Sequence, residues 1–230
     1  MQLVEPLPAE IHPPFDLTAD MLFVAGLAPT QPLRRSFPGV PFLSLFGRTP
    51  LALWFSRVTE GCYRDERGDS HCLGGPEDTL YNEVTILAVL RKRALFCPVI
   101  YASNDLSIPI AKMYGMPKEV APIALWFSGR DIKSQLSRGQ LQSAVDASQA
   151  TRGNVASALL SRLWPVWSWP VHFPARTHIQ ALVQATPKAR LAAIRQGTLK
   201  MSAPWLASPV SFMRFGLFVP QLRMQLPPPP

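Results

Sequence analysis

Proline is distributed along the whole of this chain, and no other feature restricts its fold as strongly. The 230 residues include 25 prolines, which are spread through the sequence rather than gathered in one linker. Each proline lacks the backbone N–H that a helix interior or a central strand needs, and its ring fixes φ. This pattern disfavours long helices and favours short strands broken by fixed turns. A chain of this length fits one large domain or two small ones, and we expect one mainly β (α+β) domain.

The composition supplies a core but indicates no large charged partner. Hydrophobic residues make up 47% of the chain and charged residues 17%, with a net charge of +8. The basic residues are scattered, and their densest run is Arg91, Lys92 and Arg93. A nucleic-acid binder more often shows a basic stripe interleaved with aromatic residues. We therefore expect no nucleic-acid partner, whereas an anionic small-molecule substrate fits the positive charge.

Neither a membrane segment nor a disulfide framework is expected. Glu5 and Glu10 precede any apolar stretch, which is unlike a secretory signal, and no apolar run reaches the roughly 18 residues that a spanning helix needs. The three cysteines, Cys62, Cys72 and Cys97, cannot all pair within one chain. These observations predict a soluble protein in a reducing, cytoplasmic compartment with no membrane partner.

Motifs for metals and cofactors are weak or missing. Cys62, His71 and Cys72 suggest a metal site, but no HExxH or paired CxxC motif supports one. The sequence also lacks GxGxxG, a Walker-type loop and the G-x-S-x-G elbow, which counts against nucleotide cofactors and serine hydrolase chemistry. We expect no metal and no cofactor.

The first third of the chain is predicted to hold an extended arm, strands and two loops. Residues 1–15 contain four prolines and form the arm, and a single domain then covers residues 16–226. We expect strands at Met21–Leu27, Phe42–Phe46 and Leu51–Val58. The loops are expected at Gln31–Pro41 and at the polar, glycine-containing stretch Gly61–Asp78.

A β-hairpin is the clearest local prediction. Tyr81–Leu90 and Ala94–Tyr101 are apolar and β-branched, and three charged residues join them. A helix is predicted at Gly153–Leu163, the aromatic stretch Trp164–Pro170 is either core or a subunit interface, and the Pro227–Pro230 tail is expected to be disordered. Further strands are predicted at Leu125–Phe127, Gln140–Val145, His178–Val183, Leu191–Arg195 and Phe212–Val219.

The stretch from Asn104 to Pro122 delivers a lysine at a fixed point. Ser107 can cap a short helix, Pro109 is tolerated in its first turn, and Gly115 can end it in the left-handed conformation. Lys118 comes directly after Met116-Pro117, and apolar and aromatic residues lie nearby in the sequence. Such a lysine either extends its amine to solvent along an apolar surface or holds the amine out of water for chemistry.

Three short motifs carry a resemblance to a known family. They are Tyr-Asn-Glu at 81–83, Asn-Asp at 104–105 and Gly-Met-Pro-Lys at 115–118. Their order and spacing resemble the acetoacetate decarboxylase family, in which a lysine after Gly/Ala-x-Pro forms a Schiff base with a β-keto acid. Segments 137–145, 187–191 and 218–220 extend the resemblance over most of the chain. It implies a closed antiparallel β-cone with a few short helices, assembled as a homo-oligomer.

The same resemblance implies a function. Lys118 would be the catalytic amine, and Glu83 the carboxylate that moves protons as water leaves the carbinolamine. We expect the small-molecule keto substrate to contact Tyr81, Tyr114, Met116 and Glu119. The predicted activity is that of a cofactor-free lyase, decarboxylase-like, acting on a β-keto acid or related keto compound. A Schiff-base aldolase or dehydratase, and a catalytically silent binding protein, are the alternatives.

Several positions depart from the family pattern. Glu119 stands where decarboxylating members usually carry a second lysine, and the early strand at 20–24 lacks their arginine. Leu53, Trp54 and Phe55 occupy the region of their second acid, which implies a more apolar site and a larger or less acidic substrate. The possible substitutes for the arginine are Arg34, Arg35 and Arg57.

The lysine needs a mechanism that provides its neutral form. Half-neutralising a lysine at pH 7 requires a pKa depression of roughly 3.4 units from its usual value. Full burial in apolar surroundings lowers a lysine pKa by about 3–5 units. Desolvation of Lys118 is therefore expected to suffice without a charged neighbour.

Overall fold

The computed structural model describes residues 11–128, 131–138, 141–149, 169–183, 190–200, 203–206 and 208–229. Strands dominate this part of the chain, as the sequence predicts, with two short helices, α1 (Thr30–Ser36) and α2 (Ile108–Tyr114). The strands are β1 (His12–Pro29), β2 (Arg48–Arg64), β3 (Ser70–Gly74), β4 (Tyr81–Val89), β5 (Leu95–Ala102), β6 (Lys118–Val120), β7 (Ile123–Ser128), β8 (Asp131–Arg138), β9 (Leu141–Gln149), β10 (Val171–His172), β11 (His178–Ile179), β12 (Leu182–Val183), β13 (Arg190–Lys200) and β14 (Val210–Leu226).

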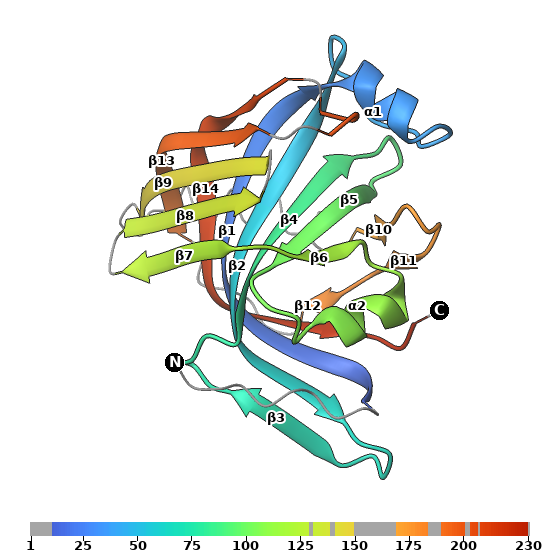
Figure 1. The fold of residues 1–230 in the computed structure, drawn as a ribbon, viewed down its shortest axis with the longest axis vertical. Helices are drawn as coiled ribbons and strands as arrows, with labels where there is room; N and C mark the ends of the chain where they lie inside the picture. Colours follow the sequence, from blue (N-terminus) through green and yellow to red (C-terminus); the bar gives the residue numbers. More distant parts are fainter. Residues whose placement is uncertain are drawn as a thin grey trace.

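All of these strands belong to one curled sheet (Figure 1). Its order is β11-β10-β5-β4-β2-β1-β14-β13-β9-β8-β7, and β3, β6 and β12 pair with β2, β5 and β14 outside this path. The pairings are antiparallel, except that β5 runs parallel to both β6 and β10. The mainly β prediction is confirmed.

Alternation along the long strands gives the sheet two different buried faces. Successive strand residues point to opposite sides, so Leu22 and Leu53 enter a large core inside the curl, which also holds residues of β7, β8 and β9. Their neighbours Met21 and Trp54 point to the other face, where they line a cavity together with residues of α2 and of segment 169–181. The side chains of Lys118 and Glu83, which the sequence predicts as catalytic, lie on this second face.

The predicted hairpin is confirmed, with β4 and β5 joined by a turn in which Arg93 has a positive φ of 50°.

Other strands are longer than expected, since β1, β2 and β14 each run for 17 or 18 residues. β1 begins at His12, within the range predicted as an arm, and Phe15 is already buried. The sequence underestimates these strands because their interior prolines and polar residues interrupt the apolar pattern.

Three local predictions in the first third of the chain are wrong. Residues 30–36 form α1 rather than a loop, and the expected strand at Phe42–Phe46 makes only isolated bridges. The expected loop Gly61–Asp78 instead continues β2 and turns into β3. Residues 61–78 are mostly polar, and polarity does not distinguish an exposed strand pair from a loop. In α1, Leu33 is buried but Pro32 and the short length of the helix obscure a helical pattern.

The cysteine prediction also requires a correction. Cys62 and Cys72 face each other across the β2–β3 pair and form a disulfide, whereas Cys97 is a buried free cysteine. The number of cysteines does not show that two of them pair, since it is the register of the β2–β3 hairpin that brings Cys62 and Cys72 together. Disulfides are uncommon in reducing compartments, so the reducing environment predicted from the sequence loses its support.

Several predictions fall wholly or partly outside the described residues. The helix at Gly153–Leu163 and most of the aromatic stretch, 164–168, lie there. Of that stretch, Trp169 contributes to a cavity wall. At the start of the tail, the Pro227 carbonyl accepts a hydrogen bond from the Tyr114 hydroxyl, so this end of the tail is ordered, unlike the prediction. Neither of the helices in the described segments has the length and apolarity needed to span a membrane.

Candidate functional site

Helix α2 and the turn after it position Lys118. Pro109 occupies the first turn of the helix, and Gly115 ends it in the left-handed conformation with φ of 66°, as the sequence predicts. Met116 N then donates back to the Ala111 carbonyl, which closes the helix end. The chain continues into β6, where Lys118 lies beside Ile100 of β5 and the Ile100 N–H donates to the Pro117 carbonyl at 2.9 Å. The lysine backbone is therefore fixed from both sides.

The Lys118 side chain enters a cavity of about 120 Å³ on the second face of the sheet. β1, β2, β4, β5 and β14 form its base, and α2, Met116 and residues 169–181 cover it. Most of the wall is apolar. Its polar or ionisable side chains are Ser56, Tyr81, Glu83, Thr85, Cys97, Ser107 and Lys118. Such a largely apolar cavity with a few convergent polar groups is typical of a small-molecule site.

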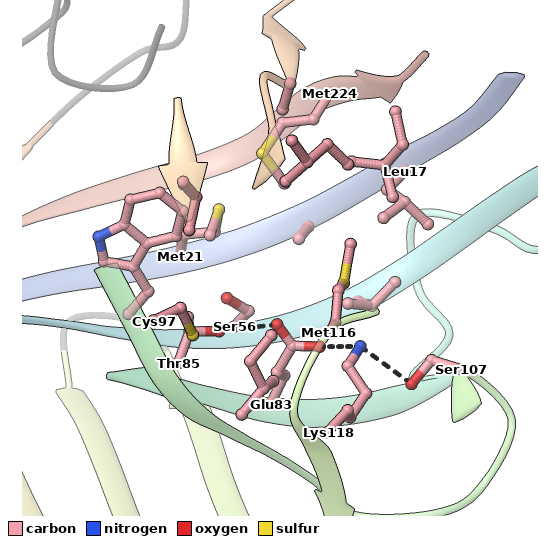
Figure 2. A pocket seen from close by; sticks show the side chains of 18 of the residues that line it. Leu17, Met21, Ser56, Glu83, Thr85, Cys97, Ser107, Met116, Lys118 and Met224 are labelled. Atoms are coloured by element: carbon pink, nitrogen blue, oxygen red, sulfur yellow. Dashed lines mark hydrogen bonds and ion pairs between the residues drawn. The ribbon is translucent and has the colours of Figure 1, made fainter. Parts of the chain in front are cut away.

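Lys118 and Glu83 form an ion pair inside this cavity (Figure 2). Lys118 Nζ lies 2.7 Å from Glu83 Oε2, and the two side chains are only 7% and 17% exposed. The amine also donates to Ser107 Oγ at 3.2 Å, and the Thr85 hydroxyl donates to Glu83 Oε1 at 2.8 Å. The Tyr81 ring centroid is 5.5 Å from Nζ. These contacts hold both members of the pair in one geometry.

The pKa of Lys118 shifts in the direction opposite to the one expected from the sequence. Burial lowers the pKa of Lys118, but the Glu83 carboxylate, with smaller effects of Tyr81 and Cys97, raises that pKa above its usual 10.5. Lys118 is therefore an ammonium at neutral pH, and the prediction that desolvation alone would neutralise it is wrong. Burial also raises the pKa of Tyr81 to about 12 and that of the Cys97 thiol well above its usual range, so both are neutral.

Ser107 has a different role from the one its position predicts. It lies at the N-cap of α2, yet its hydroxyl makes no capping hydrogen bond and accepts from Lys118 instead. Sequence reasoning also missed Thr85 and Ser56. Thr85 shares the face of Glu83 because it lies two residues farther along β4, and Ser56 is the cross-strand neighbour of Glu83 on β2. Strand alternation could have indicated Thr85, whereas Ser56 required the register.

The predicted substrate contacts divide into two groups. Tyr81 and Met116 line the cavity beside Lys118. Tyr114 and Glu119 are not among its lining residues. The Tyr114 hydroxyl donates to the carbonyl oxygens of Leu226 and Pro227, and its ring packs against Phe15. Glu119 is exposed, because adjacent residues of β6 point to opposite sides.

The candidate substitutes for an arginine lie elsewhere. Arg34 and Arg35 are exposed on α1. Arg57 pairs with the buried Asp20, and its guanidinium lies over the Phe127 ring on the face of β2 opposite to the cavity. Leu53 and Phe55 enter the core inside the curl, and Trp54 lines the cavity. Among the described lining residues, Lys118 is the only cation.

One group of potential metal ligands was found among the described residues. Ligand atoms of Glu60, Cys62 and Cys72 lie within 4.8 Å of one another. The two sulfurs are bonded to each other in the disulfide, so they are not available as thiolate ligands. His71, the third residue of the site considered from the sequence, interacts with Asp65 at 2.9 Å.

No protein-family profile and no curated protein matches the sequence. Solved structures do match the fold. The enduracididine biosynthesis enzyme MppR, complexed with the condensation product of pyruvate and imidazole 4-carboxaldehyde, has 13% identity and a TM-score of 0.55 over 98% of this chain and 96% of that one. The acetoacetate decarboxylase of Legionella pneumophila subsp. pneumophila str. Philadelphia 1 has 14% identity and a TM-score of 0.54 over 100% of this chain and 91% of that one.

A third solved structure is an acetoacetate decarboxylase-like enzyme from Sphingomonas wittichii RW1. It has 14% identity and a TM-score of 0.53 over 97% of this chain and 93% of that one. At such low identity these likenesses establish the fold, which is that of the acetoacetate decarboxylases and related enzymes. The fold expected from the motifs is confirmed.

Proposed function

We propose that this protein is a cofactor-free lyase that binds a carbonyl compound as a Schiff base on Lys118. One observation carries the proposal: a lysine amine that is largely shielded from solvent, 2.7 Å from a partly buried carboxylate, faces an apolar cavity that can hold a small molecule. A purely structural ion pair has no need of such a cavity. The likeness of the fold to enzymes that include acetoacetate decarboxylases supports the same proposal.

Imine formation uses the Lys118–Glu83 pair as a proton shuttle. Glu83 accepts a proton from the ammonium, and the neutral nitrogen attacks the carbonyl carbon to give a carbinolamine. Glu83 then returns this proton to the former carbonyl oxygen and carries a second proton from the nitrogen to the same oxygen, which leaves as water with two of the three original ammonium protons. The product is an iminium ion that carries the same positive charge as the starting ammonium. Ser107 keeps the nitrogen oriented through its hydroxyl.

The iminium then promotes cleavage next to the carbonyl carbon. The electron pair of the bond between the α-carbon and its substituent moves toward nitrogen, giving an enamine. A β-carboxylate leaves as carbon dioxide, and a β-hydroxylated carbon leaves as an aldehyde after its hydroxyl proton passes to Glu83. The α-carbon next takes a proton, and water hydrolyses the iminium to restore the Lys118 ammonium. Decarboxylation and retro-aldol cleavage are thus two uses of one intermediate.

Borohydride trapping tests the covalent step. Incubation with a methyl ketone and borohydride should reduce the iminium to a stable secondary amine, and peptide mapping should find the added mass on Lys118. The exposed Lys92 and Lys133 serve as internal controls and should stay largely unmodified.

The Lys118→Arg variant should give no adduct, because a guanidinium stays protonated. If the wild-type protein binds ketones tightly but forms no adduct, it is a silent binding protein and the lyase proposal is wrong. An adduct on a lysine other than Lys118 would also contradict the proposal.

A further inference from the structure

The cavity wall contains a balanced set of charges. Among the described lining residues, the Lys118 ammonium and the Glu83 carboxylate are the charged groups, and they are paired. Tyr81 and Cys97 are the other ionisable groups of the wall, and burial keeps both neutral. Arg57, considered from the sequence as a substitute cation, pairs with Asp20 and lies on the opposite face of β2. The described part of the wall, with its ion pair, therefore has no net charge.

Schiff-base formation preserves this balance only for an uncharged substrate. The ammonium is replaced by an iminium of equal charge, so a neutral ketone leaves the iminium and Glu83 as a matched pair. A keto acid would add a second negative charge beside Glu83 in an apolar enclosure, without a second cation on the described wall to neutralise it. Burying such an unpaired charge is strongly unfavourable.

A second observation concerns Ser56 of β2. The residue is only 3% exposed, its side chain lines the cavity, and its hydroxyl oxygen has no hydrogen-bond partner among the described residues. Ser56 lies directly across from Glu83 in the β2–β4 register, and Figure 2 shows it on the same wall as Glu83 and Thr85. A buried hydroxyl without a partner costs stability, so a ligand atom that satisfies it gains affinity.

We propose that the substrate is a neutral, apolar carbonyl compound with a second, uncharged oxygen that hydrogen-bonds the Ser56 hydroxyl. This inference rests on the proposed Schiff-base function and specifies its substrate class. A β-hydroxy ketone has the required features, because its hydroxyl lies two carbons from the carbonyl that Lys118 attacks. The reaction is then retro-aldol cleavage, in which both fragments leave uncharged.

The remaining wall suits alkyl or aryl substituents. Met21, Met116 and Met224 line the cavity together with Trp54. Methionine side chains are flexible and polarisable, so they adapt to apolar groups of different shape. The apolar part of the substrate is therefore expected to contribute affinity without a strict requirement for one chain length.

The first arm of the test compares two ketones of equal length. Heptan-2-one and 6-oxoheptanoate share the same carbonyl end and differ only in a terminal methyl or carboxylate group. The initial rate of borohydride-dependent labelling of Lys118 should be about tenfold or more higher for heptan-2-one, because the carboxylate has no partner in the cavity. Equal or faster labelling by the keto acid overturns the inference and leaves the Schiff-base function intact.

The second arm tests Ser56 by a ratio of rates. In the wild-type protein, 4-hydroxyheptan-2-one should label Lys118 roughly fivefold faster than heptan-2-one, the usual effect of one neutral hydrogen bond. This rate counts adducts of the intact hydroxy ketone together with adducts of acetone, the ketone that retro-aldol cleavage leaves on Lys118. Ser56→Ala should bring this ratio close to one. Ser134→Ala is the matched control, because it removes another buried, unpartnered hydroxyl that lies outside the cavity lining, and it should keep the wild-type ratio.

Each outcome of these two arms is decisive. A ratio that survives Ser56→Ala, or that falls equally in Ser134→Ala, overturns the assignment of Ser56. If neither ketone, nor the keto acid, labels Lys118 at all, the Schiff-base function itself fails and this inference fails with it.

Discussion

Two opposing effects act on the pKa of Lys118. Burial favours the neutral amine that attacks a carbonyl, whereas Glu83 favours the ammonium, and the second influence wins in the free protein. In the proposed reaction the neutral amine forms when the ammonium passes a proton to Glu83, rather than being present beforehand. The proposal therefore gives Glu83 two effects, proton transfer and the raised pKa of the resting lysine.

The Glu83→Gln variant separates these two effects. Removing the carboxylate leaves burial as the main influence, so the pKa of Lys118 should fall from above 10.5 to below 10.5. Competitive labelling with limiting acetic anhydride across a pH series, read on the Lys118 peptide, measures this pKa. The fraction of neutral amine at a given pH should rise in the variant, because a lower pKa releases the proton earlier.

Glu119→Gln is the control for this measurement, since it makes the same change one residue from Lys118 but on the exposed side of β6. It should leave the pKa of Lys118 unchanged. An unchanged pKa in Glu83→Gln would show that the carboxylate does not determine the charge of the lysine.

At the scale of single residues, the sequence predicts part of the candidate site. Lys118, Glu83, Tyr81 and Met116 are predicted, and the structure brings them together at one cavity. Ser107 and Ser56 were not predicted as cavity residues, because a serine in a sequence has the same appearance whether it caps a helix, faces solvent or faces a cavity. The direction of the pKa shift depends on a 2.7 Å contact between residues 35 positions apart, and no local pattern predicts such a distance.

Among the elements, α2, its terminal glycine and β6 act as one positioning unit. Gly115 adopts φ of 66°, and a Cβ at this position would lie 2.7 Å from Thr177 Oγ1. The turn therefore requires glycine for both its backbone conformation and the contact with residues 169–183. These requirements connect the helix end to the segment that covers the cavity, and Lys118 follows three residues later.

Gly115→Ala tests whether this turn sets the reactivity of Lys118. The left-handed conformation should cost the variant about 1–2 kcal/mol of unfolding free energy, and the contact with Thr177 should displace the turn. Since small displacements of a reacting group reduce rates strongly, the rate of borohydride trapping should fall by about tenfold or more. Denaturant unfolding and trapping kinetics are the two measurements.

Gly39→Ala is the matched control, because Gly39 also has a positive φ, of 84°, but no atom lies within 4 Å of its expected Cβ. It should lose stability in the same range and keep the wild-type trapping rate. Normal trapping by a destabilised Gly115→Ala variant would show that the turn serves stability alone.

Prediction of elements succeeded where local chemistry was specific. The Gly115 helix end and the β4–β5 hairpin depend on interactions between neighbours in sequence, and both are confirmed. The β2–β3 hairpin and its disulfide were missed because residues 61–78 are polar, and polar residues are equally compatible with an exposed strand pair. The lengths of β1, β2 and β14 were also missed, since they depend on pairing with distant partners.

For the whole molecule, the two faces of the sheet determine what the protein can do. The face inside the curl holds the large apolar core, and the other face holds the cavity with a single ion pair. The sequence predicts the mainly β class from its prolines and the detailed fold from its motifs, and solved structures confirm that fold. Homo-oligomer assembly stays a prediction, because it depends on contacts between chains.

Exchange of carbonyl oxygen with oxygen-18-labelled water tests the central claim most directly. A ketone that forms an iminium on Lys118 loses its oxygen as water and regains one from the solvent on hydrolysis, so the wild-type protein should catalyse label uptake into heptan-2-one. Glu83→Gln should slow the uptake by about 10²–10⁴-fold, the usual effect of losing an acid–base group, and Lys118→Arg should give the uncatalysed rate. Uptake that is equally fast with wild-type protein and with Lys118→Arg would contradict the account.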